Sequence, residues 1–163
     1  MKKHYRKIIL LAAASMLLIA CASKESRVGG LLNLKTNLKV DFKVAANVNP
    51  DEANKASPVF VKFYQLKSAK LFEDANFIDL YENDEEILAD SLISKTELEP
   101  LLPGKERTEK YVLDKETQYI GMMAEFFKYN DSKYKVIFPV TKNNVFKNAV
   151  TVSLTSNQML LED

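Results

Sequence analysis

Histidine, cysteine and tryptophan are nearly absent from this chain of 163 residues. It contains one histidine, His4, one cysteine, Cys21, and no tryptophan. A catalytic unit of the Ser-His-Asp or Cys-His kind needs a histidine, and zinc is usually held by histidine or cysteine. A single cysteine cannot form a disulfide within the chain. Once His4 is removed with the N-terminal segment, the sequence excludes a histidine-dependent catalytic unit, a histidine or cysteine zinc site and an internal disulfide. We therefore expect no metal site.

The first 20 residues have the layout of a secretory signal peptide. A basic start, MKKHYRK, precedes the apolar run Ile8–Ala20, which is shorter than the roughly 20 apolar residues of a membrane-spanning helix. Residues 1–20 carry four basic side chains and no acid, so the rest of the chain has 19 basic and 22 acidic residues, a net charge of −3. A mildly acidic domain lacks the basic patch of a nucleic-acid-binding protein, and we expect no nucleic-acid partner.

Cys21 ends this segment in the sequence Leu18-Ile19-Ala20-Cys21, which resembles the bacterial lipobox. The resemblance implies cleavage before Cys21, a diacylglycerol on its thiol and acyl chains on the new N-terminus, and two or more chains anchor a protein stably. Ala22 stands where lipoproteins of the inner membrane often have aspartate, so the resemblance implies the outer membrane. The alternative is a soluble secreted protein in which Cys21 has this position by chance. We expect no cofactor other than these covalent lipids.

Alternating apolar and polar residues predict mainly β structure in the rest of the chain. Residues 21–36 are polar and contain two glycines, so we expect a flexible tether before a domain at 37–163. Six or seven strands are expected, at 38–48, 59–66, 107–114, 118–129, 134–140 and 149–156, followed by a short tail. Such strands, without regular βαβ alternation, favour a two-sheet sandwich and make a parallel sheet unexpected.

Three local signals refine this prediction. Apolar residues at helical spacing predict a helical insertion at 68–93 after the second strand, in one or two helices with a break at Asn83-Asp84. Gly121 lies in a mostly apolar run, which predicts a strand buried on both faces with either a bulge or a close approach at the glycine. Pro139 predicts an edge position or the end of the strand that contains it.

The segment NPDEANKASP, residues 49–58, is predicted to be a loop between the first two strands. Its roughly ten residues exceed the two to five of an ordinary hairpin connection. Loops held by a rigid sheet often bind partners, and two prolines would reduce the entropy lost on docking. The alternative is a solvated connection without a partner, and these residues alone do not decide between the two.

Four blocks in order after the lipobox carry a family resemblance: VNPDEANKASPVFVKFYQLK, LFEDANFIDLYENDEEILADSL, LLPGK and QYIGMMAEFF. They resemble the TssJ family (VasD/SciN-like), the outer-membrane lipoproteins of the bacterial type VI secretion system. The resemblance implies a transthyretin-like β-sandwich with a helical insertion, no enzymatic activity, and a lipid-anchored position facing the periplasm. It also implies that the chain binds the periplasmic C-terminal region of TssM, and indirectly TssL. The implied contact is the loop between the first two strands, here Asn49, Pro50, Asp51, Glu52, Ala53, Asn54, Lys55, Ala56, Ser57 and Pro58.

Two other functions stay open at the level of the sequence. A lipid-anchored β-sandwich could bind a small ligand, which would require a deep apolar pocket. Against this, the aromatic residues are not clustered in any one loop. A carboxylate-based hydrolase would need two acids facing each other across a cleft, which adjacency in the sequence does not provide.

Overall fold

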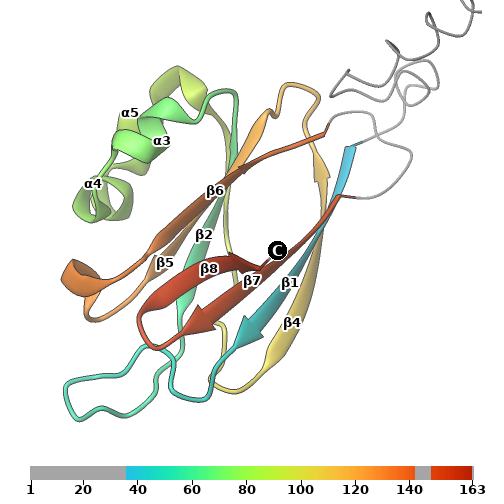
Figure 1. Cartoon of the computed structure of the whole chain (residues 1–163). Coiled ribbons are helices and arrows are strands. Elements are labelled where there is room, and N and C mark those ends of the chain that lie inside the picture. The colour runs from blue at the N-terminus through green and yellow to red at the C-terminus, as the bar shows by residue number, and fades with distance from the viewer. Residues whose placement is uncertain (1–35, 142–147, 163) are drawn as a thin grey trace, which may run out of the picture.

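The computed structural model describes residues 36–141 and 148–162, and these residues form a mainly β sandwich of two four-stranded sheets (Figure 1). The strands are β1 (Thr36–Val44), β2 (Phe60–Leu66), β3 (Leu92–Glu97), β4 (Glu106–Leu113), β5 (Tyr119–Glu125), β6 (Lys135–Pro139), β7 (Asn148–Thr155) and β8 (Gln158–Glu162). The helices are α3 (Lys70–Asp74), α4 (Phe77–Glu82) and α5 (Asp84–Leu88), with short 3-10 turns at Ala89–Ser91 and Tyr129–Asp131. The predicted sandwich with a helical insertion after the second strand is confirmed.

The order of the strands places β1 and β2 in the interior of their sheets. One sheet has the order β4-β1-β7-β8 and the other the order β3-β2-β5-β6. β1 pairs antiparallel with β4 but parallel with β7, so neither sheet is a parallel sheet, as expected, although one sheet contains a parallel pair. β6 is an edge strand and Pro139 is its last residue, so both positions that the proline predicted are found, since a proline has no N–H to donate to a further strand.

The core lies between the two sheets and follows the alternation of the sequence. Along β1, every second residue from Thr36 to Val44 is buried. β5 is buried on both faces as predicted: Met122 belongs to the core between the sheets, and Met123 belongs to a second apolar cluster on the outer face. A Cβ atom on Gly121 would lie 2.9 Å from the ring of Phe72, so of the two predicted alternatives the close approach is the one found.

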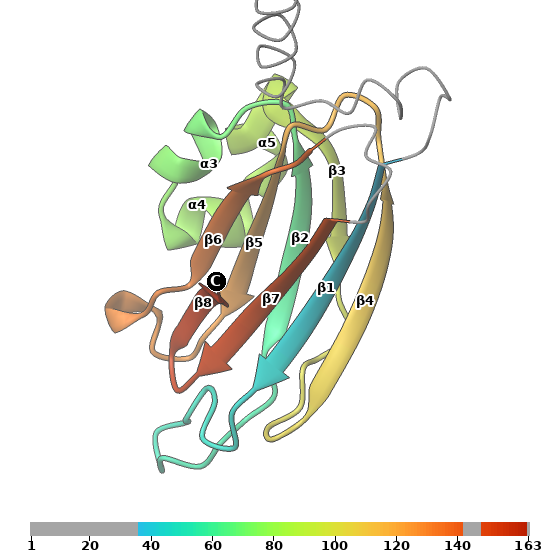
Figure 2. The same ribbon diagram turned by 45° about the vertical axis from the view of Figure 1, so that its right-hand side comes forward.

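The three helices cover the outer face of the β2–β5 sheet (Figure 2). α4 ends at Glu82 and α5 begins at Asp84, so the predicted break is present. A further break precedes α4, because the side chain of Asn76 accepts from the N–H of Asp79 while the carboxylate of Asp79 accepts from the N–H of Asn76. This reciprocal capping box fixes the start of a helix.

A buried charged cluster attaches the helical segment to the sheet. Lys62 Nζ donates to the carbonyl oxygens of Leu80 at 3.1 Å and Tyr81 at 2.9 Å, and lies 3.4 Å from Oδ2 of Asp84. The carboxylate of Asp84 also accepts from Tyr64 Oη at 2.9 Å and from a second lysine on β3. Burial acts to raise the pKa of Asp84, but the hydrogen bonds from that lysine and from Tyr64, with the charge of Lys62, outweigh it, so the pKa lies below its ordinary value.

Several predicted boundaries are wrong. The first strand ends at Val44 rather than at residue 48, and Thr36, assigned to the tether, already belongs to β1. The described residues hold eight strands instead of six or seven, because β3 follows the helices directly and the supposed C-terminal tail forms β8. The predicted signal peptide at 1–20, Cys21, and the tether up to residue 35 lie outside the described residues.

Candidate partner-binding loop and groove

The connection between β1 and β2 crosses from one sheet to the other and projects from one end of the sandwich (Figure 1). Residues 52–55 at its tip are exposed, whereas Val48, Asn49 and Val59 at its base are buried. A buried base fixes the ends of the loop while the tip stays accessible. The predicted loop at 49–58 is therefore present and is presented outward.

Asn49 holds the base of this loop. It is 3% exposed and has a φ of +47°, in the left-handed region that asparagine tolerates better than most residues. Its Nδ2 donates to the carbonyl oxygen of Pro58 at 2.9 Å, and its Oδ1 accepts from the N–H of Phe127 at 2.8 Å. Its own N–H donates to the carbonyl oxygen of Ser156 at 2.6 Å. One side chain thus joins both ends of the loop to the β5–β6 connection.

Asp51 shapes the tip of the loop. Its Oδ1 accepts from the N–H of Ala53 at 2.9 Å and from the N–H of Lys55 at 2.8 Å, and its own N–H donates to the carbonyl oxygen of Lys55 at 3.0 Å. Asn54 completes the turn with a φ of +58°, and its Oδ1 accepts from Lys128 Nζ at 3.2 Å. These bonds hold the tip of the loop in one conformation.

An apolar groove runs beside the base of the loop. We call it the aromatic groove and define it by Phe60 at the start of β2, Ile78 and Tyr81 on α4, and Phe127 after β5. It has a volume of about 440 Å³, and Asn49 and Pro58 of the loop form part of its wall. Sequence patterns barely indicate this groove, because each of its aromatic residues comes from a different element. The only local signal is that Phe60 lies on the face of its strand opposite to the core.

Acidic residues line part of this groove and of a hollow next to it. Glu82 and Glu125 contribute to its wall, and an adjoining hollow on the other side of Phe60 contains Glu97 and Glu99. Burial raises the pKa of Glu125, since the nearby charge of Lys62 only partly compensates for the lost hydration. The nearest approach between these two groups is 3.8 Å, from Nζ to Oε1.

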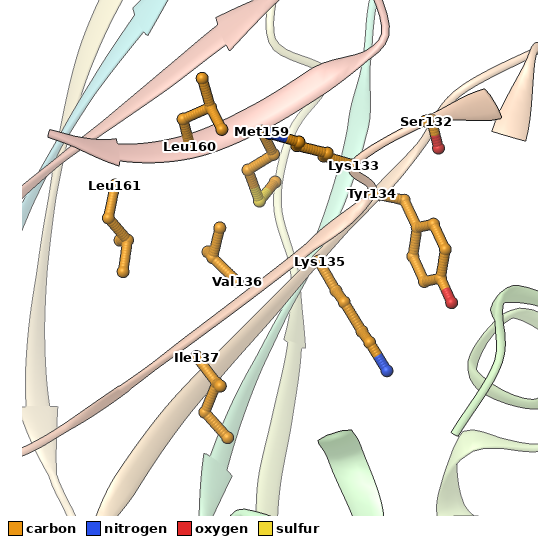
Figure 3. Close-up of a pocket in the computed structure, with 9 residues that line it drawn as sticks. All are labelled: Ser132, Lys133, Tyr134, Lys135, Val136, Ile137, Met159, Leu160 and Leu161. Carbon is orange, nitrogen blue, oxygen red and sulfur yellow. The ribbon is translucent and has the colours of Figure 1, made fainter. Parts of the chain in front are cut away.

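A second hollow of about 440 Å³ lies between the edge strands β6 and β8 (Figure 3). Val136 and Met159 lie on its two sides, while Lys135 extends toward the helices (Figure 3). There, Lys135 Nζ donates to the carbonyl oxygens of Phe72, Glu73 and Ala75, at 2.6 to 2.9 Å. Lys135 therefore caps the C-terminal end of α3, and its ammonium group is directed at these carbonyl groups rather than into the hollow.

Two further findings concern the described residues alone. Within 36–141 and 148–162, no group of three histidine, cysteine, aspartate or glutamate side chains is arranged to hold a metal ion. Over the same ranges, no helix has the length and apolar character needed to cross a membrane.

The fold and the site define a β-sandwich protein with a helical insertion and a braced loop at one end. Residues 36–157 match the family described as type VI secretion lipoprotein, which includes VasD, EvfM and TssJ. The chain belongs to this family of type VI secretion lipoproteins, which is one of structural secretion components and not of enzymes. No curated protein matches the chain in sequence.

Solved structures share the fold at low sequence identity. The type VI lipoprotein TssJ1 of Pseudomonas aeruginosa superposes with a TM-score of 0.73 at 23% identity, covering 78% of this chain and 95% of that one. Lip of Serratia marcescens, a membrane-bound component of a type VI system, gives a TM-score of 0.72 at 17% identity, covering 78% and 98%. A chain from a structure of the TssM C-terminal domain of EAEC gives 0.65 at 19% identity, covering 78% and 98%.

Proposed function

We propose that this chain is an outer-membrane lipoprotein, facing the periplasm, that anchors the type VI membrane complex by binding the periplasmic C-terminal region of TssM. Cys21 carries the lipid, loop 49–58 makes the contact with TssM, and TssL is joined indirectly through TssM. The observation that carries this proposal is the loop itself, whose base is fixed by Asn49 and whose tip is held by Asp51.

Three lines of support converge on this role. The family is one of type VI secretion lipoproteins. One structural neighbour comes from a structure of the TssM C-terminal domain, so a protein with this fold occurs in that context. The loop presents an exposed tip on a rigid scaffold, which is where binding residues are usually found. Together these favour a binding role over a solvated connection.

The anchor is tested with Cys21→Ser. We expect a folded protein that no longer fractionates with the outer membrane and that still binds the purified TssM region. The physical reason is that the substitution removes the acyl chains, which supply about 0.8 kcal/mol per buried CH₂ group, and leaves the sandwich unchanged. Outer-membrane fractionation of Cys21→Ser at the level of the unchanged chain would contradict the assigned lipid site.

The loop is tested by replacing residues 52–55 with Gly-Ser-Gly-Ser, which leaves Asn49, Pro58 and the base of the loop unchanged. We expect loss of binding to the periplasmic C-terminal region of the cognate TssM, measured by biolayer interferometry, with an unaltered circular dichroism spectrum. The matched control replaces Lys115 and Glu116, exposed in the β4–β5 turn at the opposite end of the sandwich, with Gly-Ser. Binding retained by the loop variant would refute the assigned contact.

A further inference from the structure

We propose that the aromatic groove receives a bulky apolar side chain of the protein partner that binds loop 49–58, with a lysine or arginine beside it. This inference rests on the proposed function, because the partner is the one that the loop binds. It extends the contact from a polar loop to an apolar anchor site next to it, formed by residues that the loop prediction did not include.

The first argument is the concentration of exposed apolar surface. Single exposed hydrophobic residues are normal, but a contiguous patch marks an interaction site. Eight large hydrophobic side chains are exposed among the described residues, and four of them line this groove. They are Phe60 (52% exposed), Ile78 (41%), Tyr81 (49%) and Phe127 (66%).

The second argument is that the groove is rigid before anything binds. Its floor is Phe77, which is buried and stacks on Tyr81 at 5.7 Å and on Tyr129 at 4.2 Å between ring centroids. Tyr134 contacts the same ring edge-on at 5.2 Å. Stacked aromatic rings have few rotamers to lose, so an apolar side chain would dock with a small entropic cost.

The third argument is continuity with the loop. Asn49 and Pro58 belong both to the loop and to the wall of the groove. The N–H of Phe127 is held by Asn49 Oδ1, so the groove and the loop share one structural base. A hollow formed by Asp51, Glu52, Ala53, Phe127 and Lys128 connects the groove to the tip. A partner seated on the tip therefore lies against Phe127 as well.

The fourth argument is charge, which selects the occupant. Glu82 and Glu125 lie in the wall, and Glu97 and Glu99 adjoin it. Lys62 offsets only part of this charge: it lies 3.8 Å from Glu125, but its ammonium is buried and also bonded to two carbonyl groups and to Asp84. A basic side chain beside the apolar anchor fits this field. A second copy of the chain would bring two acidic rims together, and an anionic lipid surface would be repelled.

The test measures the affinity of the mature chain (21–163) for the purified periplasmic C-terminal region of the cognate TssM. The groove variant is Phe60→Thr with Phe127→Ala, since both side chains are exposed and threonine keeps the strand propensity at position 60. We expect the Kd to rise at least about tenfold, as for anchors at the centre of an interface. The matched control is Val112→Thr with Leu71→Ala, two exposed hydrophobic residues away from the groove, and its Kd should stay within about twofold.

A charge variant tests the basic neighbour. Glu82→Gln keeps the shape of the rim and removes one of its charges. We expect a slower association rate at low salt and a weaker dependence of that rate on salt, because rim charges act mainly on association. An association rate and salt dependence equal to those of the unchanged chain would overturn the assignment of a basic residue to the partner.

A direct probe does not depend on affinity. The chain has no tryptophan, so Phe127→Trp labelled with 5-fluorotryptophan gives a single fluorine NMR resonance from the groove. We expect this resonance to shift when the TssM region is added to saturation. An unshifted resonance in the bound complex would overturn the inference.

The outcomes separate the two proposals. If the unchanged chain does not bind TssM, the proposed function fails, and the groove inference that rests on it is overturned with it. If the loop variant loses binding while the groove variant binds like the unchanged chain, only the groove inference is overturned. If the unchanged chain forms a dimer in sedimentation that the groove variant does not form, the groove belongs to a second copy and the inference is also overturned.

Discussion

Asn49→Ala is the substitution that most directly tests how the loop is held. Alanine removes two side-chain hydrogen bonds, one to the carbonyl oxygen of Pro58 and one from the N–H of Phe127. It also places alanine at a φ of +47°, a left-handed conformation that asparagine tolerates better because its polar side chain can bond locally. The change therefore combines a polar loss with a backbone strain, and the two can be separated by a second variant.

The magnitude follows from these two parts. Each lost hydrogen bond costs about 1 kcal/mol, and more where the remaining partner stays buried and unsatisfied. The left-handed conformation costs alanine roughly 1 kcal/mol. We therefore expect Asn49→Ala to lower the free energy of unfolding by about 2 to 4 kcal/mol. Asn49→Gly loses the same bonds without this strain, so it should be less destabilising by about 1 kcal/mol.

Urea unfolding followed by far-ultraviolet circular dichroism measures both variants, and biolayer interferometry measures their affinity for TssM. Because the base of the loop is loosened, affinity should fall at least about fivefold in both variants, even where the sandwich stays folded. The reasoning would be refuted if both variants unfolded within about 0.5 kcal/mol of the unchanged chain, the usual range for neutral surface substitutions. It would also be refuted if alanine were no more harmful than glycine.

The remaining predictions concern the helical insertion. Asp84→Ala should lower the free energy of unfolding in urea by about 3 kcal/mol, because it leaves buried Lys62 without the nearer of its two anionic partners. Adding Lys62→Met to the same chain should recover part of this loss. The pKa of Asp84 is lower in the folded state than in the unfolded state. Its contribution to the free energy of unfolding is therefore present above its unfolded pKa near 4 and is lost as the pH falls through its folded pKa. The difference in unfolding free energy between the unchanged chain and Asp84→Asn should therefore narrow from pH 5 to pH 2. Gly121→Ala should cost about 1 to 3 kcal/mol through the contact with Phe72, and Phe72→Leu should relieve it, as a thermal melt would show.

Those parts of the fold that depend on local periodicity were predictable. β1 alternates strictly because one face meets the core, and the run around Gly121 is apolar throughout because the helices cover its outer face. The loop was found from its prolines and asparagines, and two of its residues, Asn49 and Asp51, have local hydrogen-bonding roles typical of these residue types.

The parts that were missed depend on contacts between distant segments. β3 is a half-exposed edge strand with no clean alternation, so its sequence did not distinguish it from the end of a helix. β8 follows a two-residue turn in which Ser156 has a φ of +50°. A positive φ in such a turn is usually adopted by glycine or asparagine, so a serine there did not indicate a hairpin. The parallel pairing of β1 with β7, and the groove that joins Phe60, Tyr81 and Phe127, leave no local signal because each arises from the topology.

The position of β1 explains how such a sandwich could carry a mechanical load. Its first residue, Thr36, follows the segment that starts at Cys21, and its last residue leads into the loop, so the proposed lipid anchor and the proposed partner act on opposite ends of one strand. β1 is paired along nearly its whole length with β4 on one side and β7 on the other. The far end of the loop enters β2, which is likewise paired on both sides, with β3 and β5. A pull on the loop is therefore shared between the central strands of both sheets, and a strand can leave a sheet only after the hydrogen bonds on both of its sides are broken.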